Sequence, residues 1–459
     1  MITATKITYD KYPAYKDSGV EWLGEIPEHW EVMKIKFYCD IYSGDSLNES
    51  QKKAFESQNP NYLPYVSSRD IDLNFSTISY DSGLRIPKGK GFKIAEKNSA
   101  LLCIEGGSAG RKIGYTNQEV TFVNKLACFK SNNNVKSKFI FYFLRGLVFQ
   151  TQFFSALTGL IGGVSISNIR NFDLVIPPLS EQQKIAEFLD EKTEKIDRAI
   201  AQKEKMIALL KERKQIIIQD LVTGKKVWNA DKNTWTSPEK TKDSGVEWIG
   251  EIPENWEVLP GLIFFRENKR SNKGMKESRV LSLSYGNIII RPVEKLVGLV
   301  PESFETYQIV NPGDIIIRCT DLQNDQTSLR TGISNDNGII TSAYINLGVI
   351  GENLPEYLHY YLHFIDISKV LYKFGSGLRQ NLSFSDFKRM PIIRVPLSEQ
   401  LEIVKIINEI STKIDKAIDL QAQQIEKLKE LKSTLIDSAV TGKLRVPALQ
   451  EIKVSDYAE

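Results

Sequence analysis

The stretch "KDSGVEWLGEIPEHWEV" covers residues 16–32, and "KDSGVEWIGEIPENWEV" covers residues 242–258. The two copies are identical at 15 of 17 positions, and we call the shift that carries Lys16 onto Lys242 the opening offset. Two further motifs return in the same order, namely "PLSEQ" from Pro178 and Pro396 and "VTGK" from Val222 and Val440. Both share a slightly smaller shift, from Pro178 to Pro396, which we call the helix offset. Self-similarity at a fixed offset is the signature of an internal repeat, so the sequence predicts a duplicated scaffold.

The segments between the repeated motifs differ in their loops. "LLCIEGGSAGRKIGYT" (residues 101–116) and "IIIRCTDLQNDQTSLRTG" (residues 315–332) each begin as a short apolar strand and continue into a polar loop. Loops carry function, whereas strands and helices carry packing. A shared framework with different loops is suited to holding two different recognition surfaces.

The segments after "PLSEQ" are predicted to be helices, with Ser180 and Ser398 as N-caps and with Gly224 and Gly442 as C-terminal stops. Each would be roughly 40 residues and about 60 Å long. One register of alternating three- and four-residue steps is mostly apolar in both segments. It contains Ile196, Ile200, Ile207, Leu210 and Ile217, interrupted by Lys203 and Lys214, and then Ile414, Ile418, Ile425, Leu428 and Leu435, interrupted by Gln421 and Lys432. A helix with so narrow an apolar stripe is not stable alone in water, so it needs a partner to pack against. We expect the two helices to pair as an antiparallel coiled coil; the alternative is that each packs only on its own domain.

Composition limits the possible classes of protein. The chain has 459 residues, enough for two to four domains, and a net charge of only +3, so DNA binding would require clustered basic residues. The four cysteines, Cys39, Cys103, Cys128 and Cys319, show no C-x-x-C pairing, which favours a reducing cytoplasm. The sequence shows no signal peptide and no apolar run of the ~18 residues that would suggest a membrane span, so we expect neither.

The doubled opening motif and the doubled "PLSEQ" helix resemble the DNA-specificity subunit of type I restriction–modification systems, over residues 16–443. The resemblance implies a mixed α/β fold with two target recognition domains, separated by two helices and related by a pseudo-two-fold repeat. It implies that each domain reads one half of a split site in double-stranded DNA. It also implies two modification subunits that methylate adenine and restriction subunits that translocate and cut DNA. S-adenosylmethionine, ATP and Mg²⁺ would belong to those partners, and this cytoplasmic chain would be non-catalytic.

The repeat also predicts where the domains begin and end. The predicted segments are a first target recognition domain (1–178), a first helix (179–225), a linker (226–241), a second target recognition domain (242–396), a second helix (397–443) and a C-terminal tail (444–459).

Three motifs bear on catalysis. "NPNY" (residues 59–62) resembles an adenine-methyltransferase signature, but no Gly-rich cofactor loop accompanies it, which favours a turn. "EGGSAGRK" (residues 105–112) lacks the P-loop Ser or Thr and is better suited to touching DNA phosphates. "HYYLH" (residues 359–363) lacks the Glu of zinc proteases and favours an amphipathic helix. We therefore predict no catalytic and no metal-binding residues.

Candidate DNA contacts follow from side-chain chemistry, because phosphates take Lys, Arg and small polar donors, whereas base edges take paired donors and acceptors. In the first domain the candidates are Ser68, Arg69, Lys88, Lys90, Lys93, Arg111, Lys112, Ser165 and Asn168. In the second domain they are Lys269, Arg270, Lys273, Tyr285, Asn287, Arg318, Gln323, Asn324, Arg379, Gln380 and Asn381. For each set, solvated surface is the alternative.

The apolar residues of the opening motif are shared by both copies, so they cannot distinguish two DNA sequences. These are Trp22, Ile26, Pro27 and Trp30, with Trp248, Ile252, Pro253 and Trp256. We expect them to fix each domain to the helix ends and to help receive the partner subunit. On this basis Trp22→Ala should impair folding or assembly before it changes sequence preference.

Three alternatives remain open at this stage. The chain could be the specificity subunit of another methylation or defence system, which neighbouring genes would reveal. It could be a stand-alone nucleic-acid enzyme, which would act by itself with Mg²⁺ or S-adenosylmethionine. It could also be a structural dimerisation protein, which would not bind DNA even with a methyltransferase subunit.

Overall fold

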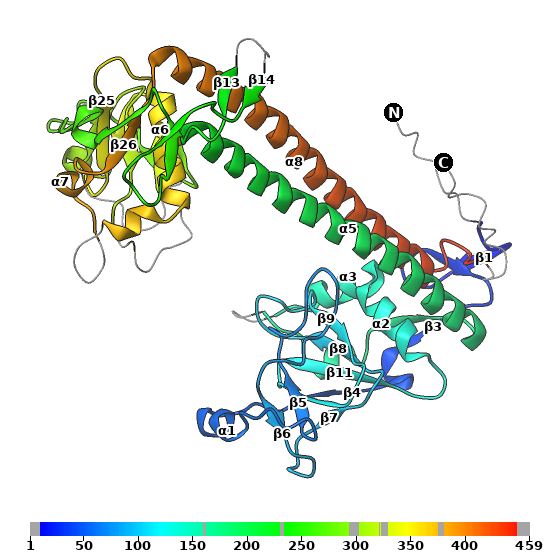
Figure 1. Ribbon diagram of the computed structural model, residues 1–459. Coiled ribbons are helices and arrows are strands. Elements are labelled where there is room, and N and C mark those ends of the chain that lie inside the picture. The colour runs from blue at the N-terminus through cyan, green and yellow to red at the C-terminus, as the bar shows by residue number, and fades with distance from the viewer. Residues whose placement is uncertain are drawn as a thin grey trace. The chain divides into compact units, whose positions relative to one another are not determined.

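Two long helices and two mixed α/β domains make up the chain. The structure, a computed structural model, describes residues 10–158, 162–229, 234–292, 303–320, 322, 329–374 and 381–447. The 44-residue helices α5 (Leu179–Val222) and α8 (Leu397–Val440) pack together (Figure 1). The chain divides into unit 1 (Met1–Glu204 with Ala422–Glu459) and unit 2 (Lys205–Gln421), so each unit holds one domain and part of each helix. No helix in the described ranges has the length and apolarity needed to cross a membrane.

The domain of unit 1 alternates short strands with a few helices. Its elements are β1 (Tyr15–Asp17), β2 (Glu25–Pro27), β3 (Glu31–Lys34), the 3₁₀ turn η1 (Ile35–Phe37), β4 (Cys39–Ser43), α1 (Glu49–Ala54), β5 (Leu63–Val66), β6 (Arg85–Ile86), β7 (Ile94–Ala95), β8 (Ala100–Cys103), β9 (Ile113–Tyr115), β10 (Val120–Phe122), β11 (Leu126–Ser131), α2 (Ser137–Arg145), α3 (Leu147–Ser155), α4 (Ile166–Ile169) and β12 (Asp173–Ile176).

Two four-stranded sheets organise this domain. One is antiparallel in the order β4-β11-β8-β9, and the other has the order β6-β5-β10-β7 with β5 parallel to β10. In the first, Phe129 lies opposite both Ile41 and Ala100, and all three side chains are buried. The main core includes α2, whose run from Phe139 to Leu144 is wholly buried.

The domain of unit 2 contains the following elements: β13 (Val227–Asn229), β14 (Thr234–Thr236), β15 (Thr241–Asp243), β16 (Glu251–Pro253), β17 (Glu257–Pro260), η2 (Gly261–Ile263), β18 (Phe265–Glu267), β19 (Leu281–Ser284), β20 (Asn287–Ile290), η4 (Phe304–Thr306), β21 (Gln308–Val310), β22 (Ile315–Ile317), β23 (Thr331–Ile333), β24 (Gly338–Ile340), β25 (Ile345–Val349), α6 (Pro355–Ile367), η5 (Val370–Lys373), α7 (Phe384–Phe387) and β26 (Pro391–Arg394).

The two domains share one framework. The sheet β18-β25-β22-β23 corresponds to β4-β11-β8-β9, and the pair β17-β26 corresponds to β3-β12. The helix offset, defined by the two "PLSEQ" motifs, also carries the first residue of α2 onto that of α6 and the first residue of α4 onto that of α7. The duplication therefore extends through the segments whose sequences differ.

Each core is closed by the start of one long helix and the end of the other. In unit 1 these are Ile185 to Leu189 of α5 and Leu435 to Val440 of α8. In unit 2 they are Ile403 and Ile407 of α8 and Ile218 to Val222 of α5. Each long helix therefore packs both on its partner helix and on a domain at each end.

The long helices begin two residues earlier than N-caps at Ser180 and Ser398 would require. Both start at the Leu of "PLSEQ", so Ser180 and Ser398 are the second helical residues and the N-cap prediction was wrong. The carbonyl oxygen of Pro178 accepts the first hydrogen bonds of α5, from the backbone N–H groups of Glu181 and Gln182. A proline tolerates this place because its missing N–H would have no helical partner there.

Polar pairs fix the direction of the packed helices. In unit 1, Lys432 lies 2.5 Å from Asp197, and Lys203 hydrogen-bonds Gln424, so residue numbers rise along α5 as they fall along α8. In unit 2, Lys214 lies 2.8 Å from Asp415. Under the helix offset, Lys214 corresponds to Lys432, and Asp197 corresponds to Asp415. The lysine therefore lies on α5 in one pair and on α8 in the other. The helices are thus antiparallel, as predicted.

Candidate nucleic-acid interface

All three repeated motifs meet at one place in each unit, which we call the clasp. In unit 1 the clasp consists of Pro27, Trp30, Glu181 and Gly442, and the buried Trp30 Nε1 donates to Glu181 Oε2 at 3.0 Å. In unit 2 it consists of Pro253, Trp256, Glu399 and Gly224, and Trp256 Nε1 donates to Glu399 Oε2 at 2.9 Å. The opening motif therefore joins the start of one long helix to the end of the other.

The glycine of the clasp is required for two reasons. Gly442 and Gly224 have φ of +74° and +78°, in the left-handed region where an L side chain is strained. A Cβ on Gly442 would lie 2.4 Å from Pro27 Cδ, and one on Gly224 would lie 2.3 Å from Pro253 Cδ. Each helix therefore ends where the opening motif packs against its backbone.

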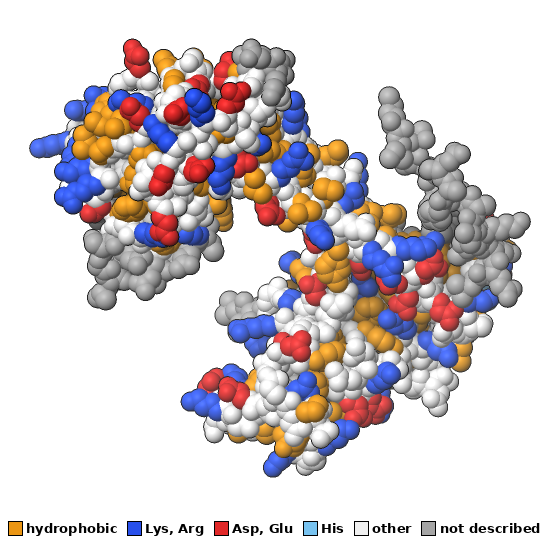
Figure 2. All heavy atoms as spheres, in the orientation of Figure 1, with side chains coloured by type: hydrophobic (Ala, Val, Ile, Leu, Met, Phe, Trp, Pro, Cys, Tyr) orange, Lys and Arg blue, Asp and Glu red, His pale blue; other side chains and the backbone are white. Residues whose placement is uncertain are grey.

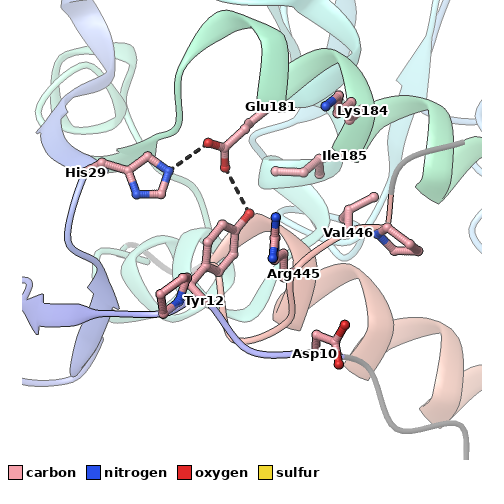
Figure 3. A pocket seen from close by; sticks show the side chains of 10 residues that line it. Asp10, Tyr12, His29, Glu181, Lys184, Ile185, Arg445 and Val446 are labelled. Carbon is pink, nitrogen blue, oxygen red and sulfur yellow. Dashed lines mark hydrogen bonds and ion pairs between the residues drawn. The ribbon is translucent and has the colours of Figure 1, made fainter. Parts of the chain in front are cut away.

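A polar pocket of about 570 Å³ opens beside the clasp of unit 1 (Figure 3). Glu181 points into it and accepts from Tyr12 Oη at 2.9 Å, while His29 Nε2 lies 2.7 Å from its other oxygen. Burial, followed by the neighbouring Glu181 carboxylate, raises the pKa of Tyr12. Three side chains thus hold this carboxylate, which fixes the first turn of α5.

The Gln of "PLSEQ" attaches each helix to its domain. Gln182 Oε1 accepts from the backbone N–H of Lys136, and Gln400 Oε1 accepts from that of Leu354, both at 2.8 Å. These N–H groups belong to the residues that precede α2 and α6. Both the Glu and the Gln of "PLSEQ" therefore have a structural role. The Glu belongs to the clasp, and the Gln holds the domain.

In unit 1 the turn after β5, the loop before β9 and the loop before α4 converge; we call them loop cluster 1. Lys112 Nζ donates to the carbonyl oxygen of Ser68 at 2.8 Å, which joins the first two segments. The backbone N–H of Gly106 donates to Gly162 O at 2.9 Å, which joins the third. Predicted residues that loop cluster 1 brings together are Ser68, Arg69, Arg111, Lys112, Ser165 and Asn168.

Within loop cluster 1 the predicted residues differ in what they can offer. Arg69, Arg111 and Asn168 are exposed. Lys112 is half-buried and holds the turn through Ser68, and Ser165 Oγ accepts from the backbone N–H of Asn168 at 3.2 Å. Arg69, Arg111 and Asn168 are therefore the side chains best placed to contact a ligand, while Lys112 and Ser165 shape the loops.

The three other predicted lysines of unit 1 lie elsewhere, in the segment between β6 and β7. Lys88 forms an ion pair with Glu119, and Lys93 Nζ donates to Ser43 O at 2.9 Å. Lys90 is exposed. The structure thus separates this predicted group from loop cluster 1.

In unit 2 the corresponding three segments also converge, as loop cluster 2. The turn of the β19–β20 hairpin lies against the end of the loop before β23, since a Cβ on Gly286 would lie 3.3 Å from Leu329. The backbone N–H of Leu382 donates to Cys319 O at 2.9 Å, which joins the segment before α7 to the start of the same loop. Tyr285 and Asn287, both predicted, are exposed in this turn.

Tyr285 is the most prominent side chain of loop cluster 2. It is 83% exposed and has a φ of +46°, which is rare for a residue other than glycine. The following Gly286 has a φ of +80°, so the pair makes a tight hairpin turn. An aromatic ring held in solvent by a strained turn is suited to stacking on a ligand rather than to stabilising the fold.

A buried cation anchors the long loop of loop cluster 2. Arg330 corresponds to Lys112 under the helix offset, and its side chain is fully buried. Its Nη1 donates to the carbonyl oxygens of Arg318 and Thr320, at 3.2 and 2.9 Å. Lys112 and Arg330 therefore use the same position to hold a loop by its backbone, although the loops themselves differ.

The basic loop after β18 forms a separate surface of unit 2. Arg270 forms an ion pair with the buried Asp314, which also accepts from Asn268 at 3.0 Å, so the guanidinium belongs to an internal network. Lys269 lies 3.0 Å from Glu267, and Lys273 is exposed. On the face that Figure 2 shows, Lys and Arg side chains of unit 2 gather at one edge, while acidic side chains are interspersed elsewhere.

The remaining predicted residues divide into two groups. Arg318 is half-buried and Asn381 is exposed, at the two ends of the segments that form loop cluster 2. Gln323, Asn324, Arg379 and Gln380 lie outside the described residues.

The motif "HYYLH" lies on α6; Tyr361 and Leu362 are buried, and both histidines are half-buried. Burial lowers the pKa of His359 to about 4, and the neighbouring His363 adds to this effect. Burial and then Lys214 lower the pKa of His363 to about 4 as well. Among the described residues no group of three or more His, Cys, Asp or Glu side chains could hold a metal ion.

Residues 67–70 and 285–288 are equivalent; the sequence predicted candidate DNA contacts in both places but not their exact register. They follow β5 and β19 and are related by the helix offset, which also relates "GLIGGVSISN" (159–168) to "GLRQNLSFSD" (377–386). Extending this offset through the variable segments would have predicted both loop clusters.

Comparisons with known proteins agree with this architecture. The family model for the type I restriction modification DNA specificity domain matches residues 27–208 and 267–430. The chain is 23% identical to the type I restriction enzyme MjaVIII specificity subunit of Methanocaldococcus jannaschii over 444 residues, which is 92% of this chain and 95% of the relative.

A second relative is the type I restriction enzyme EcoKI specificity subunit of Escherichia coli K12, which is 22% identical over 92% of this chain and 90% of its own length. A solved structure, determined in work on assembly and conformational transition of the type I R-M system, has a similar fold. The TM-score is 0.63 at 14% identity, over 91% of this chain and 99% of that chain. With two matched regions covering most of its length, the chain belongs to the family of type I restriction–modification DNA-specificity subunits.

Proposed function

We propose that this chain reads a split, asymmetric site in double-stranded DNA and positions adenine methylation for a type I restriction–modification complex. The observation that carries the proposal is that the same three loops converge in both domains while their side chains differ. Loop cluster 1 offers Arg69 and Arg111, whereas loop cluster 2 offers Tyr285 and Asn287. One framework with two chemistries is what two unlike half-sites require.

The chemistry is proposed to belong to partner subunits. Two modification subunits would bind S-adenosylmethionine and methylate, and restriction subunits would use ATP and Mg²⁺. This chain would contribute recognition alone, in the cytoplasm where its buried free thiols remain reduced. Its modest net charge of +3 indicates that the partners supply much of the phosphate contact.

A selection experiment tests the proposal. The chain, purified together with its modification subunit, would be incubated with a random duplex library at physiological salt, and the bound DNA would be sequenced. The expected result is one motif in two parts separated by unread base pairs. Enrichment of a single continuous motif, or of none, would contradict the proposal.

A stand-alone enzyme is the second candidate from the sequence, and the same preparation addresses it. The chain alone would be tested with Mg²⁺ and with S-adenosylmethionine. We expect no cleavage and no methyl transfer, because no Gly-rich cofactor loop accompanies "NPNY" and the described residues hold no cluster of His, Cys, Asp or Glu that could bind a metal ion.

A further inference from the structure

One position of the duplicated framework holds a cation whose hydrogen-bond target differs between the two units. Lys112 and Arg330 occupy this position, directly before β9 and β23. The Lys112 side chain is half-buried, and the Arg330 side chain is fully buried. Removing a charged group from water is costly unless other groups compensate it, so the partners of each side chain show what it does.

The backbone at this position is the same in both units. The backbone N–H of Cys103 donates to Lys112 O at 2.9 Å, and that of Arg318 donates to Arg330 O at 2.8 Å. The register of the two sheets makes Arg318 the counterpart of Cys103. Each bond closes the loop before β9 or β23 at its base, and the cation belongs to the residue that closes the loop.

A second shared bond joins each of these loops to the segment before α4 or α7. The backbone N–H of Val164 donates to Ile104 O at 3.0 Å, and that of Leu382 donates to Cys319 O at 2.9 Å. Val164 and Leu382 are related by the helix offset. The two loops therefore begin and end in equivalent frames, and the units differ in their side chains and in what the cation holds.

In unit 1 the cation holds together the two segments that present exposed guanidinium groups. Lys112 Nζ donates to Ser68 O at 2.8 Å, in the turn after β5. Ser68 directly precedes Arg69, and Arg111 directly precedes Lys112; both arginines are exposed. One hydrogen bond therefore fixes the backbone of Arg69 against the backbone of Arg111.

In unit 2 the cation holds the start of its own loop. Arg330 Nη1 donates to the carbonyl oxygens of Arg318 and Thr320, at 3.2 and 2.9 Å. The backbone N–H of Arg330 donates to the buried Asp366 of α6 at 2.6 Å, and the guanidinium carbon lies 5.8 Å from the centre of the Tyr372 ring. The start of this loop is thus held by a side chain whose own place is set by α6 and η5.

We propose that Lys112 and Arg330 are positioning residues that set the base preference of their half-sites through the backbone, without touching DNA. The inference rests on the proposed function, in which each loop cluster reads one half-site. A side chain that reads a base edge must lie within about 0.5 Å of its productive place, so the group that fixes its backbone contributes to discrimination between bases. Lys112 positions Arg69 and Arg111, and Arg330 positions Arg318 and the residues that follow it.

The test measures selectivity separately from affinity. The full chain, purified with its modification subunit, would compete for duplexes that carry the selected split site with one base pair altered in one half. Arg330→Met removes the charge from the buried position and should lower discrimination in one half-site by about tenfold, with the other half-site unchanged. Lys112→Met should lower discrimination in the other half-site only.

Rescue and a core variant separate positioning from a general loss of stability. Arg330→Lys and Lys112→Arg keep a cation and should retain most of the discrimination, because a single nitrogen makes both contacts of Arg330. Ile407→Ala is the matched control, since Ile407 is buried in the core of unit 2 at α8. It should lower the urea midpoint without changing discrimination in either half-site.

The proposal is overturned if the methionine variants weaken binding to all duplexes equally, if either variant affects both half-sites, or if the retained cations give no rescue. Should Arg330→Met fail to fold, Lys112→Met decides, because its side chain is only half-buried. Failure of the wild-type complex to select any split site would instead overturn the proposed function itself.

Discussion

At the scale of single residues, the clasp explains why two tryptophans of the repeated motif behave differently. Trp30 is wholly buried and its indole N–H meets Glu181, whereas Trp22, in the same motif, is 46% exposed. The counterpart of Trp22 is half-buried, because Trp248 lies 6.3 Å from the ring of Phe364 on α6. Trp22 was expected to help fix its domain to the helix ends; in unit 1 it is Trp30 that makes the buried contact with the start of α5.

We expect Trp30→Ala to lower the free energy of unfolding of unit 1 by about 3–5 kcal/mol, the usual cost of emptying a buried aromatic site. Trp22→Ala should cost less than about 1 kcal/mol, because water already surrounds much of its ring. Urea denaturation of the full chain, followed by circular dichroism, measures both. A larger loss for Trp22 than for Trp30 would show that the clasp is misassigned.

A pH dependence follows from the two half-buried histidines of α6. Their pKa values are lowered to about 4 in the folded chain, against an ordinary 6.5, so the unfolded chain binds more protons between these values. Stability is therefore fully present above pH 6.5 and falls as the pH drops towards 4. At pH 5 the loss is about 2 kcal/mol for each histidine.

The groups facing these rings include Lys214 from α5, which further lowers the pKa of His363. Because the chain has only three histidines, a titration of their ring signals by nuclear magnetic resonance can resolve each one. Two of the three should titrate near pH 4. Titration of all three near pH 6.5 would contradict the burial of α6.

At the scale of elements, the two equivalent ion pairs of the long helices differ in burial. The Lys432 side chain is 7% exposed and also donates to Asn74 O at 3.0 Å, so it ties a loop of the first domain to α8. The Lys214 side chain is 24% exposed and its partner Asp415 is 55% exposed. Burial, with nearby Arg145, lowers the pKa of Lys432, and Asp197 opposes this effect.

We expect Lys432→Ala to cost about 3 kcal/mol of unfolding free energy, since it leaves Asp197 poorly solvated and without its partner. The matched variant Lys214→Ala should cost at most about 1 kcal/mol, because that pair is partly exposed to water. Thermal and urea unfolding compare the two. Equal losses would mean that burial does not distinguish the pairs.

The long helices could be predicted well because their signals are local and doubled. The steps of three and four, the absence of Pro and Gly, and the closing Gly224 and Gly442 all depend on neighbouring residues. The predicted N-caps lie two residues late, because serine is a strong N-cap former, whereas here the carbonyl of Pro178 takes the first hydrogen bonds.

The loop clusters could be predicted only in part, because they depend on contacts between distant segments. The roles of Lys112 and Arg330 as backbone anchors depend on which turn lies opposite, and residue type alone does not reveal that. Arg270 was predicted to face DNA but forms an ion pair with a buried carboxylate, since Asp314 is far away in sequence. Side-chain chemistry in a sequence suggests candidates, and the fold determines which of them are free.

At the scale of the whole molecule, we predict that each loop cluster governs its own part of the DNA site. Arg69→Ala with Arg111→Ala should weaken binding of one half-site by about 1–3 kcal/mol, and Tyr285→Ala should affect the other half-site alone. Competition binding with DNA altered in one half at a time measures this. Lys88→Ala is the control, since Lys88 is paired with Glu119 outside loop cluster 1.

If both variants altered the same half-site, the loop clusters would not be separate readers, and the duplication would serve assembly instead. If Lys88→Ala had the larger effect, the segment between β6 and β7 would be the contact surface of unit 1. Unchanged binding of both half-sites in all three variants would place recognition outside the loop clusters.

The most direct test of sequence selection by this chain is genome-wide sequencing of adenine methylation in host cells with and without its gene. We predict that one motif in two unlike parts, separated by unread bases, is methylated in the wild type and disappears on deletion. Reintroduced Tyr285→Ala should restore methylation with relaxed preference in one part only. Unchanged methylation after deletion, with the modification subunit present and active, would contradict the claim that this chain selects the sequence.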